Sequence, residues 1–146
     1  MALSVLVERE VIPRHLDEND LPWLRVLFEK RYGADYDPET AEAWFKNCVL
    51  KSPMLFQPIR SDNAFCITII NVMPWRPNTF EAQVVVACAE DGFMWELLGL
   101  LRMSIEWSKR RKCENWRITS ETEYDLGPLA LRLGAKEQHK RYIMRF

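Results

Sequence analysis

The chain has 146 residues, of which 48% are hydrophobic and 28% are charged, and its 20 basic and 21 acidic side chains leave a formal net charge of -1. This length and composition predict one globular domain over residues 1–146, and the balanced charge gives no electrostatic reason to expect a nucleic-acid partner. No apolar run approaches the roughly 20 residues that a membrane helix needs, and the first residues do not read as a signal peptide. We therefore expect no membrane partner and a cytoplasmic location.

Four cysteines stand far apart in the sequence, and two histidines lie near its two ends. No CxxC pair is present, and neither His15 nor His139 stands at ligand spacing from a cysteine. Cys66 and Cys88 lie within apolar runs, where a free thiol behaves as a small buried hydrophobe. The pattern predicts free cysteines and no metal site.

The hydrophobic pattern predicts elements in the order β-α-α-β-β-β-α-β-α-β. The expected strands cover residues 3–12, 54–60, 64–73, 79–88, 114–120 and 140–146, and the expected helices cover 20–33, 37–50, 93–112 and 126–135. Asp20 is expected to cap the first helix, and Gly33 to end it. Helices between the last three strands require crossover connections, so part of the sheet must be parallel. We expect an α/β domain with a mixed central sheet of about six strands flanked by helices.

The stretch CAEDGFMWELLGLL, residues 88–101, leads from an expected strand into an expected helix. A glycine just before a helix N-terminus is typical of loops that bind phosphate through backbone N–H groups and the helix dipole. With this loop between the fourth strand and the third helix, the order of elements resembles the GNAT N-acetyltransferase superfamily over essentially the whole chain. The last expected helix, LGPLALRLGA, also resembles the final helix of that family, which typically ends in Leu-Gly-Phe.

The resemblance implies acetyl-CoA as the first ligand to test. The GNAT loop is written R/Q-x-x-G-x-G/A and leads into a leucine pair, which places it on residues 89–94 if that pair is Leu97-Leu98. The residues expected to contact acetyl-CoA are Val86, Ala87 and Cys88 along the pantetheine arm, and Gly92, Phe93, Met94 and Trp95 at the pyrophosphate.

The motif is incomplete on this alignment. Gly92 is retained, but Ala89 stands at the Arg/Gln position, and Met94 replaces the final small residue. Glu90 and Asp91 also place two carboxylates beside a site for an anion. These changes predict a weakened phosphate site.

Two residues are candidates for proton transfer. Many GNAT enzymes place a tyrosine in the last helix to protonate the leaving thiolate, but this position is Ala130 here. Tyr124 is the substitute if its loop folds toward the cleft. Glu81, in the fourth strand, is the candidate general base for the incoming amine.

Trp75 lies between two prolines in the loop MPWRPN, residues 73–78. It either folds back over the sheet or stays exposed as an anchor for a protein partner or for self-association. The sequence leaves both open.

Two functions follow from the resemblance. The incomplete loop and the missing tyrosine favour a non-catalytic or weakly active binding or structural component with an eroded acyl-CoA site. The chain is also similar to short GNAT-like proteins of tailed phages, which implies a place in host cytoplasm or virion. The alternative is an acetyl-CoA-dependent N-acetyltransferase acting on an amine.

Overall fold

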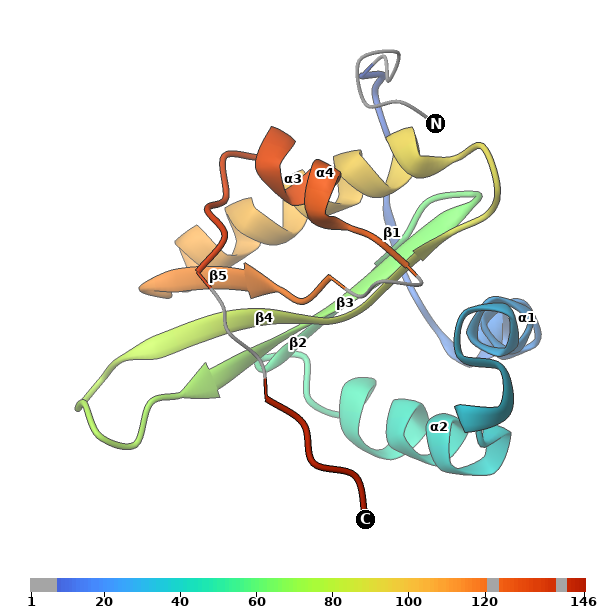
Figure 1. Ribbon diagram of the computed structural model, residues 1–146, viewed down its shortest axis with the longest axis horizontal. Helices are drawn as coiled ribbons and strands as arrows, with labels where there is room; N and C mark the ends of the chain where they lie inside the picture. Colours follow the sequence, from blue (N-terminus) through green and yellow to red (C-terminus); the bar gives the residue numbers. More distant parts are fainter. Residues whose placement is uncertain (1–7, 121–123, 139–141) are drawn as a thin grey trace.

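The computed structural model describes residues 8–120, 124–138 and 142–146 (Figure 1). In chain order the elements are β1 (Arg14–His15), η2 (Glu18–Asp20), α1 (Leu21–Tyr32), η3 (Gly33–Asp35), α2 (Pro38–Trp44), η4 (Phe45–Val49), β2 (Phe56–Arg60), β3 (Ala64–Val72), β4 (Phe80–Ala89), α3 (Met94–Arg110), β5 (Asn115–Ile118) and α4 (Gly127–Arg132).

The sheet has the strand order β1-β2-β3-β4-β5. Its neighbours pair antiparallel except β4 and β5, which are parallel, as their connection through α3 requires. The mixed α/β class is therefore confirmed. Within the described residues the sheet has five strands rather than about six.

The two expected terminal strands account for this difference. Residues 8–12 of the first form no strand, and residues 142–146 of the last form none and are exposed; residues 1–7 and 139–141 lie outside the described part. The first strand is instead β1, which pairs with β2 through Arg14 and Arg60. Val11 is buried against Gly99 of α3, so this apolar residue packs against a helix and is not part of a strand.

Each face of the sheet is covered by its own pair of helices (Figure 1). Leucines of α3 and α4 form one buried cluster with Ala64, Cys66 and Ala87 of the sheet. Residues of α1 and η4 form the other with Phe65, Ile67 and Val86, and Trp44 of α2 packs against it. Because successive strand residues point to opposite faces, neighbouring positions of β3 and β4 enter different clusters.

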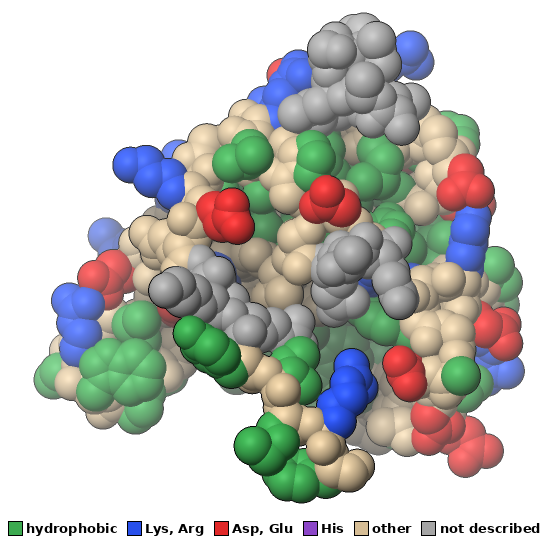
Figure 2. Space-filling view, in the orientation of Figure 1, with side chains coloured by type: hydrophobic (Ala, Val, Ile, Leu, Met, Phe, Trp, Pro, Cys, Tyr) green, Lys and Arg blue, Asp and Glu red, His purple; other side chains and the backbone are tan. Residues whose placement is uncertain are grey.

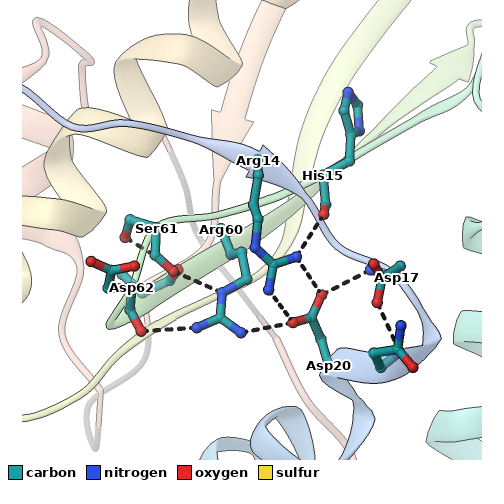
Figure 3. A network of polar contacts seen from close by, with 9 residues as sticks. Arg14, His15, Asp17, Asp20, Arg60, Ser61 and Asp62 are labelled. Atoms are coloured by element: carbon teal, nitrogen blue, oxygen red, sulfur yellow. Dashed lines mark hydrogen bonds and ion pairs between the residues drawn. The ribbon is translucent and has the colours of Figure 1, made fainter.

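A buried carboxylate holds the start of α1 against the sheet (Figure 3). Asp20 accepts hydrogen bonds from Arg14 of β1 at 3.0 Å, from Arg60 of β2 at 2.8 Å and from the Asp17 amide at 2.9 Å. Burial raises the pKa of Asp20, but these hydrogen bonds outweigh it and hold the pKa below its ordinary value. Asp20 therefore does not cap α1 as expected: its side chain caps the backbone of Asp17.

No helix in the described part of the chain has the length and apolar character needed to cross a membrane.

Candidate functional site

The pairing between β4 and β5 ends midway along β4. Their pairing joins Glu81–Val84 to Asn115–Ile118, while β4 continues to Ala89. The second half of β4 therefore has no described strand on the side away from β3. The N–H groups of a strand point alternately to its two sides, so alternate amides of this half stay available to a ligand.

An irregularity in the β3–β4 pairing lies at the point where β5 ends. Ile67 pairs with Val86 and Thr68 with Val84, so Val85 has no opposite residue. The extra residue places Val84 in the α3 cluster and Val86 in the α1–α2 cluster, and leaves Val85 42% exposed. The bulge thus directs two successive valines toward α1 and α2.

Tyr124 lies in the gap that opens beside β4. Its hydroxyl accepts a hydrogen bond from the Ala89 amide at 3.0 Å, which shows that this N–H points away from β3. By alternation the Ala87 amide points the same way. Burial raises the pKa of Tyr124 to about 12, and the neighbouring Cys88 adds to the rise. The phenol is therefore protonated at neutral pH and can donate its proton.

The turn before α4 holds Tyr124 in this place. The Ser120 hydroxyl accepts hydrogen bonds from the amides of Leu126 at 2.9 Å and Gly127 at 3.1 Å. It also donates to Asp125, whose carboxylate accepts from the Gly127 amide at 2.8 Å. The end of β5 is thereby tied to the start of α4, and Tyr124 lies at the gap, which is the condition for it to replace the missing tyrosine.

The loop between β4 and α3 offers free backbone amides. Gly92 adopts φ +85, and the Phe93 amide closes a turn onto the Glu90 carbonyl at 3.0 Å. The amides of Asp91, Gly92, Met94 and Trp95 make no hydrogen bond to the described residues. They lie at the N-terminus of a 17-residue helix, where unpaired N–H groups and the helix dipole favour an anion.

The Met94 side chain is directed toward the gap. Its sulfur lies 3.9 Å from the Tyr124 hydroxyl, and its side chain packs against the α3 cluster. The Cys88 side chain packs on the opposite face of the sheet, against α1, and burial raises the pKa of its thiol. Cys88 is therefore not a thiolate nucleophile at neutral pH.

Cations from other segments lie on the acidic loop and on the aromatic rings next to it. Lys30 at the end of α1 forms an ion pair with Asp91 at 2.7 Å. The next residue, Arg31, lies with its guanidinium 4.2 Å above the Tyr124 ring. Arg9 lies 5.2 Å above the Trp95 ring in the first turn of α3. Sequence reasoning missed these residues because nothing in their local pattern links them to the loop.

A cavity of about 350 Å³ lies where α1, α2 and the bulge of β4 meet. Val85 and Val86 line it on the β4 side. Aromatic side chains and carboxylates from α1, α2 and their connection complete the lining. Tyr32 belongs to this lining, and Arg31 contacts both Tyr32 and Tyr124, so the cavity lies next to the gap. We call it the α1–α2 pocket.

The structure does not bring Glu81 to this region. It lies near the start of β4, eight residues before Ala89, or about 25 Å along an extended strand. Its carboxylate pairs with Arg117 of β5 at 2.8 Å. The other candidate residues, from Val86 to Trp95 together with Tyr124, do lie around one gap.

Trp75 lies at the tip of the β3–β4 hairpin and is 71% exposed. It does not fold back over the sheet. Figure 2 shows hydrophobic side chains gathered at this tip, far from the gap. A role for Trp75 in partner binding stays a prediction. No group of metal-binding side chains occurs in the described part of the chain.

No protein-family model matches the sequence, and no curated protein matches it significantly. Solved structures do match. An aminoglycoside N-acetyltransferase, AAC(6')-Iy, solved in complex with CoA, is 14% identical, with 97% of this chain and 99% of that chain covered and a TM-score of 0.73. A Trypanosoma brucei acetyltransferase is 14% identical, with 94% of this chain and 100% of that chain covered and a TM-score of 0.72.

The glucosamine-6-phosphate N-acetyltransferase of Arabidopsis thaliana is 11% identical, with 94% of this chain and 99% of that chain covered and a TM-score of 0.73. At such identities the likeness shows the fold alone. It confirms the fold that the sequence resemblance implied, whereas the similarity to phage proteins stays a prediction.

Proposed function

We propose, from the premise that the chain has the GNAT fold, that it binds an acyl-CoA beside β4 and transfers the acyl group to an amine held in the α1–α2 pocket. The observation that carries this proposal is the open half of β4. It exposes backbone amides on one edge and meets a pocket of ligand size at Val85 and Val86.

The described residues fit acyl-CoA in two respects. The open edge of β4 from Val86 to Cys88 offers hydrogen bonds to the amide groups of a pantetheine arm. The amides of Asp91, Gly92, Met94 and Trp95, with Lys30 and Arg31 nearby, suit a pyrophosphate. The bound thioester would supply the activated acyl group.

The chain's own residues then have defined roles. Asp35 and Asp37 in the pocket lining attract the ammonium form of the amine, whose proton leaves to water or to one of these carboxylates. Tyr124 is the group placed to deliver a proton to the leaving thiolate. Its pKa of about 12 keeps the hydroxyl protonated at neutral pH and also makes it a weaker acid than a free phenol. Valine and aromatic side chains around the pocket offer apolar contacts to the group that carries the amine.

The experiment that tests this proposal is calorimetric titration of the protein with acetyl-CoA and with desulfo-CoA. Desulfo-CoA keeps the pyrophosphate and lacks the acyl thioester. We expect both to bind at micromolar strength, about -8 kcal/mol, and free thiol to appear when amines are added with acetyl-CoA. Absence of heat and of a thermal shift at millimolar ligand would contradict the proposal.

A non-catalytic binding or structural component, such as one built into a phage particle, is the second candidate. Its specific support is the hydrogen bond by which Tyr124 already occupies the Ala89 amide. Glu90 and Asp91 beside the α3 N-terminus also oppose an anion. This candidate predicts no thiol release with any amine, and leaves assembly through Trp75 to be tested.

A further inference from the structure

The walls of the α1–α2 pocket are mainly aromatic. Phe28 and Tyr32 come from α1, Tyr36 from the connection and Trp44 from α2. The Phe28 ring stacks on Tyr36 with centroids 5.6 Å apart and planes 8° apart, and on Tyr32 with centroids 5.9 Å apart. These contacts fix the rings before a ligand arrives, so the pocket presents preformed flat apolar surfaces.

The charge of the pocket is negative. Asp35 and Asp37 belong to its lining, and no lysine or arginine among the described residues does. Thr40 donates a hydrogen bond to Asp37, which orients that carboxylate. Arg25, on α1 nearby, pairs with Glu42 at 3.0 Å and also interacts with the Tyr36 side chain, and Arg31 lies over the Tyr32 ring, so each of these cations already has a partner. Carboxylates and ring faces together favour a cation.

The size of the pocket limits what it holds. At water's share of about 30 Å³ per heavy atom, 350 Å³ accommodates about a dozen atoms. This matches one ring with a short arm. An aminoglycoside of several rings exceeds it. A linear polyamine such as spermidine fits by volume, but it offers no ring to the aromatic walls, and two carboxylates do not match its several charges.

We infer that the acceptor is a primary amine on a short arm attached to a single aromatic or similarly flat apolar ring. The ring packs among Phe28, Tyr36 and Trp44, and the amine is attracted by Asp35 and Asp37. Val85 closes the pocket where β4 leaves β5, next to the open edge. This inference rests on the proposed function, because it names the substrate class of the same site.

The test is binding of 2-phenylethylamine to the full chain, measured by calorimetry in the presence of saturating desulfo-CoA, which has no acyl group to transfer, and again without it. Ethylamine lacks the ring, 2-phenylethanol lacks the charge, and spermidine carries several charges without a ring. We expect 2-phenylethylamine to bind about tenfold or more tightly than each of the three. Equal or tighter binding of spermidine or ethylamine would overturn the inference.

A matched pair of variants locates the binding. Val85→Phe fills the pocket from the exposed bulge residue, whereas Val72→Phe makes the same change at an exposed position of β3 outside the lining. We expect Val85→Phe to weaken 2-phenylethylamine binding at least about tenfold and Val72→Phe to leave it unchanged. Equal effects would overturn the inference, and the four-ligand comparison on the unmodified chain decides it if Val85→Phe does not fold.

The two proposals fail in different ways. If acetyl-CoA does not bind but 2-phenylethylamine binds as expected, the proposed function fails and the assignment of the pocket stands. If acetyl-CoA binds and thiol is released with spermidine but not with 2-phenylethylamine, the proposed function stands and the ring-bearing acceptor is wrong.

Discussion

Replacing Tyr124 with phenylalanine removes one oxygen atom from the gap beside β4 and keeps the ring beneath Arg31. The Ala89 amide loses its acceptor at 3.0 Å. A neutral hydrogen bond contributes about 0.5–1.5 kcal/mol net to stability, and a buried amide left without any hydrogen-bond partner costs up to about 3 kcal/mol. Water can reach the open gap, so we expect a loss near 1 kcal/mol, equivalent to a fall of about 2–4 °C in melting temperature.

The same substitution separates the two candidate functions. If Tyr124 protonates the leaving thiolate, kcat falls by about 10²–10⁴ while the affinity for acetyl-CoA is retained. If its hydroxyl merely occupies the Ala89 amide, Tyr124→Phe frees that amide, and acetyl-CoA binds up to about tenfold more tightly. The assays are thermal melting, calorimetric titration with acetyl-CoA, and thiol release in the presence of amines.

Tyr142→Phe is the matched control, because Tyr142 is 87% exposed near the end of the chain. Figure 2 shows this end as a projection of mainly hydrophobic side chains. The control should change neither stability nor binding. If Tyr124→Phe matches it in melting temperature, acetyl-CoA affinity and turnover, the reasoning about the Tyr124 hydroxyl is refuted.

Three further predictions concern the loop, the phenol and the hairpin tip. Gly92→Ala strains a backbone at φ +85, so it should lower the free energy of unfolding by about 1 kcal/mol and weaken acetyl-CoA binding. Gly134→Ala, at φ +90, is the control: it should lower stability as much in melting experiments and leave acetyl-CoA binding unchanged. Because the pKa of Tyr124 is raised to about 12, the unfolded chain ionises first, and the stability of the native protein relative to Tyr124→Phe should fall from about pH 10 to pH 12; a difference that does not vary with pH in denaturant titrations would contradict this. Trp75→Ala should leave acetyl-CoA binding unchanged and should weaken self-association in analytical ultracentrifugation if Trp75 is an anchor, and a loss of acetyl-CoA binding would show that the tip is coupled to the gap.

The fold was predictable where side-chain periodicity decides it. The leucines of α3 and the buried runs of β3 and β4 follow patterns that permit one arrangement. The ends of the sheet were not predictable in this way. β1 has two residues and pairs with β2 where Arg14 and Arg60 both bind Asp20, while the apolar residue Val11 packs against α3. Pairing with a neighbour, rather than local pattern, decides such short edge strands.

The candidate site was predictable only in part. The strand-to-helix loop and its glycine are visible in sequence, and so is Tyr124 as a candidate. The exposure of Val85 follows from a bulge, which depends on the β3–β4 register. The α1–α2 pocket depends on how two helices dock against that bulge. Neither has a local signal, because both arise from contacts between segments distant in sequence.

The charge around the α3 N-terminus shows why this matters for function. Sequence neighbours make the loop acidic, since Glu90 and Asp91 adjoin Gly92. Folding adds Lys30, which lies 61 positions from its partner Asp91, and with it Arg31 and Arg9. The Lys30–Asp91 pair is exposed, so it adds little to stability, but it offsets the charge of one carboxylate beside the helix N-terminus. One of the two carboxylates that argued against an anion in the sequence is therefore paired with a lysine in the described structure, two arginines lie on neighbouring rings, and the eroded motif alone does not decide against acyl-CoA.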